Sequence, residues 1–114
     1  MVGEIGAADW AKEVSKTLAG FDATQHNSTN HRHALSGDEA TCWSYMTAEH
    51  IFIEDGDSSS VTLGGEYKNT LVRDGSGWRI ARCQLTIHWS RGDMMLFPKA
   101  QQRAAEKGLF WQGE

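Results

Sequence analysis

The amino-acid sequence predicts an α+β fold, in which a curved antiparallel sheet packs against an N-terminal helix and is followed by a short C-terminal helix. Three observations support this prediction. Long runs with the alternation of strands fill the middle of the chain. Two gaps between these runs hold the Gly and Asp residues that tight hairpins need. Segments with helix start and stop residues lie at both ends of the chain.

The first helix is expected over Asp9 to Ala19. Its apolar residues recur every four positions and form one stripe: Trp10, Val14 and Leu18. Asp9 suits the start of the helix, and Gly20 suits a left-handed residue just past its end. A helix this short needs a partner surface, and the sheet is the obvious one.

Four long strands are expected, over Ala23 to Leu35, Glu39 to Ile53, Val61 to Arg73 and Trp78 to Ser90. Tight turns at 36–38 and 74–77 join the first two and the last two. The acidic, Ser-rich segment Glu54 to Ser60 is expected to be an exposed, mobile loop. Long adjacent hairpins twist and coil, so the sheet is expected to be curved.

The tail is expected to form a helix over Pro98 to Lys107, with Gly108 after its end. Apolar residues precede this helix, and Leu109 to Trp111 follow it. Leaving all of them in water would expose more apolar surface than a small monomer usually shows. We therefore expect the tail to dock over a cavity mouth or onto a partner subunit.

Length and composition exclude several classes of protein. The chain of 114 residues fits one domain over residues 1–114, and its net charge of −4 comes without any basic run. Nucleic-acid binding is not expected, because its electrostatic footprint is missing. No apolar run nears the roughly 20 residues that span a bilayer, and no signal peptide is visible, so a cytoplasmic location is expected. Cys42 and Cys83 are expected to be buried thiols.

Strand alternation groups a set of side chains that suits a small-molecule site. In the second strand, the residues from Cys42 to Phe52 at every other position share one face, with His50 among them. The expected pocket wall is mostly apolar with a few polar groups, which is usual for a ligand pocket. It consists of Met46, His50, Tyr67, Asn69, Leu85 and Trp89.

Several motifs, in order, resemble the SnoaL-like branch of the nuclear transport factor 2 superfamily. They are Gly20-Phe21-Asp22-Ala23-Thr24-Gln25-His26, the run from Gly37 to Thr41 continuing to Ala48-Glu49-His50, Gly64-Gly65-Glu66-Tyr67, Leu71-Val72-Arg73 and Gly77-Trp78-Arg79-Ile80-Ala81. The resemblance covers about Asp9 to Asp93. It implies a cone-shaped fold, commonly dimeric, with the pocket inside the cone.

The scytalone dehydratases of that superfamily are similar to this chain at Thr24-Gln25-His26, His50 and Asn69, and a dehydrochlorinase has its base near the position of His26. The resemblance therefore implies that His26 is a general base or acid and His50 a second acid or orienting donor. It implies that Asn69 binds substrate. Family members usually begin with further helices that supply an Asp and tyrosines. This chain lacks that segment, so it is a fragment, is completed by a partner, or only binds.

Two functions follow from this resemblance. One is cofactor-independent lyase or isomerase chemistry, in which histidines move a proton on a small, largely apolar molecule. The alternative is a non-catalytic small-molecule-binding or dimerisation domain. A homodimer or larger assembly is expected in either case, with Trp43, Tyr45 and Ile51 as candidate interface residues.

His31 and His33 form an HxH pair on one strand face. Such a pair can chelate a metal when a third ligand comes from a neighbouring strand. The alternative is a solvated, outward-facing pair. No third ligand has suitable spacing, so no metal site is predicted.

Overall fold

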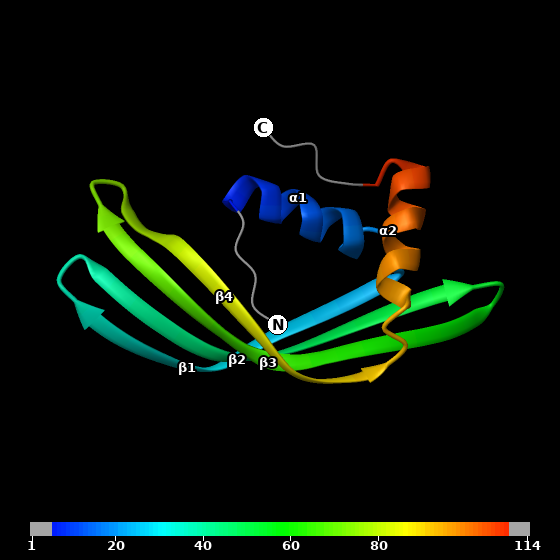
Figure 1. Cartoon of the computed structure of the whole chain (residues 1–114), viewed down its shortest axis with the longest axis horizontal. Helices are drawn as coiled ribbons and strands as arrows, with labels where there is room; N and C mark the ends of the chain where they lie inside the picture. Colours follow the sequence, from blue (N-terminus) through cyan, green and yellow to red (C-terminus); the bar gives the residue numbers. More distant parts are fainter. Residues whose placement is uncertain (1–5, 110–114) are drawn as a thin grey trace. The chain divides into compact units, whose positions relative to one another are not determined.

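The computed structural model describes residues 6–109 and confirms the α+β fold. Its elements in order are α1 (Ala7–Leu18), β1 (Ala23–Ser36), β2 (Glu39–Glu54), β3 (Asp57–Asp74), β4 (Gly77–Gly92) and α2 (Leu96–Lys107). The strands form one curved antiparallel sheet in the order β1-β2-β3-β4 (Figure 1). Each strand therefore pairs with its neighbour in the sequence, as hairpin connections require.

The connection between β2 and β3 differs from the expected mobile loop. β2 continues to Glu54 and β3 already begins at Asp57, so only two residues form the turn. Asp55 and Gly56 have φ angles of 52° and 81°, and a two-residue hairpin turn with positive φ at both positions matches the twist of the strands. The prediction of a loop over Glu54 to Ser60 was wrong because the Asp-Gly pair was not recognised as a turn, whereas the predicted exposure of these residues is confirmed.

The chain folds as two compact units, each built from separate segments. The hairpin unit contains His26–Thr47 and Leu63–Trp89. The helical unit contains the described residues 6–25, Ala48–Thr62 and 90–109. The prediction of one domain over residues 1–114 stays a prediction.

The helical unit holds an apolar core. Its buried cluster consists of Phe21, Phe52, Val61, Leu96 and Ala100, with Leu18 and Phe97 partly buried against it. On α2, Leu96, Ala100 and Ala104 are buried at a spacing of four, so this helix presents one narrow stripe to the core. The predicted C-terminal helix is confirmed and starts two residues earlier, and it ends at Gly108 in the left-handed conformation.

The ends of α1 differ from their prediction. The helix begins at Ala7, with Gly6 at the cap position, so Asp9 lies in the first turn rather than at the cap. Gly20 is not left-handed. It is required for another reason, because a Cβ atom there would lie 1.8 Å from the carbonyl oxygen of Ala100. α1 buries none of its residues fully and packs against α2.

A polar network centred on Arg103 also holds the helical unit together. Arg103 donates to the carbonyl oxygens of Gly20 (3.2 Å) and Ile53 (2.7 Å) and to Asp22 Oδ2 (2.9 Å). Its guanidinium lies 3.6 Å from the centre of the Phe52 ring. The same Asp22 oxygen accepts the backbone N–H of Ile53 at 2.6 Å. That N–H, followed by Arg103, lowers the pKa of Asp22 below its ordinary value.

The described residues also test the expectations for the two cysteines and for membrane-spanning segments. Cys42 and Cys83 are free thiols and are half-buried, and burial raises the pKa of Cys83. Within residues 6–109, neither helix is long and apolar enough to cross a membrane. The end of the apolar tail, Phe110 and Trp111, lies outside the described residues.

Candidate functional site

Contacts between neighbouring strands show which side chains of the hairpin unit share a face. Between β1 and β2, the guanidinium of Arg32 lies 4.4 Å from the centre of the Trp43 ring. Between β2 and β3, the N–H of Arg73 donates to the carbonyl oxygen of Asp38 at 2.7 Å. Arg73 also lies over the ring of Trp78 on β4. Because side chains alternate along a strand, these contacts determine the cross-strand rows.

The backbone of β1 departs from regular alternation at Asn30, which has a φ of 57°. Ser28 Oγ lies 2.9 Å from Ser44 Oγ on β2, and His31 Nε2 lies 3.3 Å from the same Ser28 oxygen. Residues three apart on a regular strand point to opposite faces, yet these two meet. The left-handed Asn30 therefore acts as a bulge that moves His31 to the face of Ser28.

The hairpin unit consequently has two different faces. We call one the histidine face, with His26, Ser28, His31, His33, Cys42, Ser44, Met46, Tyr67 and Asn69. We call the other the tryptophan face, with Arg32, Thr41, Trp43, Tyr45, Gly64, Thr70 and Trp89. The β2 residues Ser44 and Met46 on the histidine face are buried, whereas every residue of β1 is exposed.

Of the residues predicted for the site, the structure brings His26, Met46, Tyr67 and Asn69 onto the histidine face. Trp89 is not among them. Gly64 lies opposite Thr47 and thus on the tryptophan face, and a Cβ atom on Gly64 would lie 1.9 Å from the Trp89 ring. The Trp89 ring therefore packs over Gly64 on that face, and the strand alternation that grouped Trp89 with Tyr67 does not hold across β3 and β4.

His50, which was also predicted for the site, belongs to the core of the helical unit. It is 2% exposed, and its Nδ1 lies 3.0 Å from the carbonyl oxygen of Val61. Its ring centre lies 5.0 Å from each of the rings of Phe21 and Phe97. An Nδ1–H that donates to Val61 satisfies a backbone carbonyl in an apolar surrounding, which is what a core histidine does.

The environment sets the protonation of two residues on the histidine face. His26 is exposed overall, yet desolvation of its ring lowers its pKa below the ordinary value, so its neutral form is favoured at neutral pH. Desolvation, and then the nearby Cys83, raises the pKa of Tyr67. At neutral pH His26 can accept a proton, and the Tyr67 hydroxyl remains a hydrogen-bond donor.

Asn69 carries an unsatisfied acceptor. Its side-chain oxygen is shielded from water and is the one such buried side-chain atom without a hydrogen-bond partner among the described residues. A buried acceptor without a donor costs roughly 1–3 kcal/mol. Asn69 is thus prepared for a donor that the described part of the chain does not supply.

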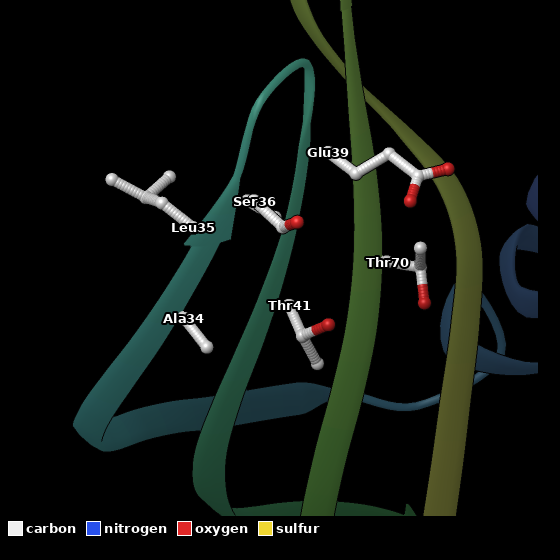
Figure 2. A pocket seen from close by; sticks show the side chains of 7 residues that line it. Ala34, Leu35, Ser36, Glu39, Thr41 and Thr70 are labelled. Carbon is white, nitrogen blue, oxygen red and sulfur yellow. The ribbon is translucent and has the colours of Figure 1, made fainter.

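The cavities lie away from these residues. In the hairpin unit, a shallow depression of about 150 Å³ is lined by Ala34, Leu35, Ser36, Glu39, Ala40, Thr41 and Thr70. Figure 2 shows Glu39, Thr41 and Thr70 projecting to the same side, with Leu35 turned away. A groove of about 340 Å³ in the helical unit is lined by Phe52 and by charged residues of α2. The depression is smaller than an ordinary ligand pocket of roughly 300–1,000 Å³.

No group of three or more His, Cys, Asp or Glu residues within 6–109 is arranged to hold a metal ion. His31 and His33 stack with their ring centres 6.5 Å apart and their planes 14° from parallel.

Comparison with known families agrees with the sequence motifs, since the SnoaL-like domain matches residues 2–84. The chain belongs to the SnoaL-like family. No curated relative matches this SnoaL-like chain significantly.

Solved structures share the fold. Kfla4162 protein from Kribbella flavida is 27% identical, with a TM-score of 0.70 over 80% of this chain and 63% of that one. A Novosphingobium aromaticivorans protein provisionally assigned as a scytalone dehydratase has 24% identity and a TM-score of 0.55, covering 64% and 48%. A hexachlorocyclohexane dehydrochlorinase has 18% identity and a TM-score of 0.56, covering 64% and 49%. The SnoaL-like chain spans less than two thirds of each of these three proteins.

Sequence reasoning missed the part of the site that depends on the bulge. Ser28 and Ser44 were not selected, and His31 and His33 were assigned no place beside Tyr67 and Asn69. The available indication was an Asn within a strand, because Asn tolerates the left-handed conformation better than most residues do. Such an Asn predicts a bulge only where other residues have already established that the segment is a strand.

Proposed function

We propose that this SnoaL-like domain binds a small, largely apolar molecule on the histidine face and catalyses proton transfer of the lyase or isomerase type, without a cofactor. The observation that carries the proposal is the unsatisfied, buried oxygen of Asn69. It shares its face with a neutral histidine, a protonated tyrosine and an apolar side chain, Met46.

Each of these groups has a role in the proposal. His26 removes the proton, because its lowered pKa keeps the imidazole neutral at the working pH. Tyr67 donates to an oxygen on which negative charge develops. Asn69 accepts a hydrogen bond from a hydroxyl or amine of the ligand. His50, expected from the resemblance to be a second acid or orienting donor, instead supports the core through Val61 in this proposal.

Proton exchange on a simple ketone tests this function. With 2-indanone in D₂O, the chain should accelerate deuterium incorporation at the acidic carbon, followed by NMR. His26→Gln should slow the catalysed rate by about 10²-fold or more, as expected for the loss of a general base. His88→Gln is the matched control, because His88 is a half-exposed histidine that faces Glu66 at 3.8 Å. No catalysed exchange by the wild-type chain, or equal rates for both variants, would refute catalysis by His26.

One observation favours the alternative, a non-catalytic binding or dimerisation domain. All of β1 is exposed, and an open face does not exclude water as catalytic pockets do. The tryptophan face also exposes Tyr45 at 59% and Trp89 at 46%. A homodimer or larger assembly would cover such residues. Light scattering of the wild type and of Tyr45→Lys tests this, and a monomer for the wild type at micromolar concentration would refute assembly through this face.

A further inference from the structure

We infer that His31, His33 and Ser28 form an anion-binding subsite on the histidine face, which recognises the carboxylate of a ligand with an apolar body. The inference rests on the proposed binding of small molecules at this face. It adds the chemical class of the ligand and three residues that have no role in the proposed proton transfer.

The hairpin register and the bulge at Asn30 together create the subsite. The register places His31 and His33 in the same cross-strand rows as residues proposed to hold the ligand, and the bulge brings Ser28 and His26 to the same face. One row runs across the strands from His31 to Ser44 to Tyr67. The next row runs from His33 to Cys42 to Asn69. Residues directly opposite on neighbouring strands have Cβ atoms about 5 Å apart, so two rows of this kind lie within the length of a small molecule.

Hydrogen bonds orient the first imidazole. His31 Nε2 lies 3.3 Å from Ser28 Oγ, and Ser28 Oγ donates to Ser44 Oγ at 2.9 Å. With its proton given to Ser44, the Ser28 oxygen is an acceptor, so it favours an Nε2–H on His31. The ring is therefore held in place by a partner that suits the protonated form, which carries N–H on both nitrogens.

The charges around the two histidines favour an anion. The titratable or charged groups of the histidine face that accompany them are His26 on β1, Cys42 on β2, Tyr67 on β3 and, by the Arg73–Trp78 register, Arg82 on β4. Arg73 also lies on this face, near the hairpin turn, where it pairs with the carboxylate of Asp38 at 3.1 Å. The only carboxylate identified on this face among the described residues is thus already paired with a cation, so a protonated imidazole here would have an anionic ligand as its counter-charge.

The described carboxylates of the hairpin unit are occupied elsewhere. Asp38 pairs with Arg73 at 3.1 Å and Asp74 with Arg79 at 2.7 Å. Glu66 faces His88 at 3.8 Å, and Glu39 lines the shallow depression with Thr41 and Thr70. None of the four is placed to neutralise His31 or His33, so a ligand anion is the matching partner.

A metal ion fits the pair less well than a carboxylate does. The rings of His31 and His33 are nearly parallel with centres 6.5 Å apart, and no third ligand is arranged beside them among the described residues. Met46 on the same face is 4% exposed and offers little surface, but Tyr67 is half-buried, so its ring offers an apolar body a surface beside the polar end. The matching ligand thus combines a carboxylate with an apolar group.

Phenylacetate and its neutral counterpart phenylacetamide test the inference. Binding to the full chain is measured by NMR titration at pH 5.5 and pH 8.0. We expect phenylacetate to bind about tenfold more tightly than phenylacetamide at pH 5.5, as one charge-assisted hydrogen bond at a partly exposed site provides. The preference should weaken at pH 8.0, because a neutral imidazole cannot form a charge-assisted hydrogen bond with the carboxylate.

Variants assign the preference to the subsite. His31→Gln and His33→Gln should each reduce the pH 5.5 preference to about twofold or less, while His88→Gln keeps it. Deletion of Asn30 should reduce the preference by moving Ser28, the partner of His31, to the other face, and Asn30→Gly should keep it because Gly accepts the same backbone conformation. The point variants decide the matter if the deletion does not fold.

Several results would overturn the inference. They are equal binding of the two probes at pH 5.5, no binding of either, an unchanged preference in His31→Gln, or inorganic phosphate that displaces phenylacetate at equal concentration. Equal binding with shifts at the Asn69 side chain would leave the proposed function standing. A retained preference without any shift at Asn69 or His26 would instead refute the proposed function and keep the subsite.

Discussion

The two units of the chain contain histidines in opposite circumstances. In the helical unit, His50 is 2% exposed, is bonded to a backbone carbonyl and lies between two phenylalanine rings. In the hairpin unit, His26, His31 and His33 lie on an exposed strand, and the buried oxygen of Asn69 has no hydrogen-bond partner within residues 6–109. Among the described residues, the helical unit therefore satisfies its buried side-chain polar atoms internally, and the hairpin unit leaves one acceptor unpaired.

The difference indicates a division of roles between the two units. Core packing and the Arg103 network provide stability in the helical unit, so that substitutions there should change folding. The histidine face contributes little apolar burial from β1, so that substitutions there should change binding with small effects on folding. Four predictions test this division, from the largest expected effect to the smallest.

The largest effect is expected at Phe52. Phe52→Ala should reduce the free energy of unfolding by about 3–5 kcal/mol, because the ring is 3% exposed and supports both Phe21 and the guanidinium of Arg103. Tyr45→Ala is the control in the hairpin unit, since Tyr45 is 59% exposed, and should cost under about 1 kcal/mol. Urea unfolding measures both. Similar losses for the two would contradict the division between the units.

The Arg103 network should make the helical unit sensitive to acid. The pKa of Asp22 is lowered in the folded chain, so its stabilisation is present above the unfolded pKa and is lost as the pH falls through the folded pKa. Arg103→Met should cost about 1–3 kcal/mol at pH 7, toward the low end because the Asp22 side chain is 37% exposed. Asp22→Asn should flatten the stability profile below about pH 4. An unchanged acid profile in that variant would refute the role of Asp22.

Replacing Asn69 should change the stability of the fold and the binding of a ligand in opposite directions. Asn69→Leu removes the buried acceptor that lacks a partner, so it should raise the free energy of unfolding by about 1 kcal/mol and weaken ligand binding. Asn69→Asp, of the same size, should instead destabilise the fold because it buries a charge. Thermal unfolding of the three proteins measures this. If Asn69→Leu is less stable than the wild type, the oxygen has a partner after all.

The smallest effect concerns His26. Its pKa is lowered on folding, so the unfolded chain binds more protons in the range where an imidazole titrates, and stability should fall as the pH decreases through that range. The change should be small, because the residue is exposed overall. His26→Gln should remove this component of the pH profile, with His88→Gln as control. Stability that rises toward acid in the wild type because of His26 would contradict the lowered pKa.

Much of the fold was predictable from local patterns. Strand alternation in β2 identified the face that is buried, from Ser44 and Met46 to His50 and Phe52, because the side chains on that side of the strand are mostly small or apolar. Glycine marked the end of α2, where Gly108 is left-handed. The SnoaL-like motifs also predicted the family that the comparison then showed.

The candidate site was only partly predictable. Alternation placed Tyr67 and Asn69 together, because β3 keeps one register against β2. It grouped Trp89 with them incorrectly, because it cannot show which face of β4 meets which face of β3. It left His31 and His33 without a role, because regular alternation cannot show that a left-handed residue at Asn30 brings His26 and Ser28 onto the same face as these two histidines.

The sequence by itself determined the α+β class, the helix at each end, the four strands and the family, since each depends on residue periodicity or motif order. Tertiary structure decided the requirement for Gly20, whose missing Cβ admits the backbone of Ala100 from a helix far along the chain. It also decided that His50 is enclosed and that the Asn69 oxygen finds no donor in the described part of the chain. These properties depend on contacts between segments distant in sequence, and local propensity carries no information about which atoms such segments bring together.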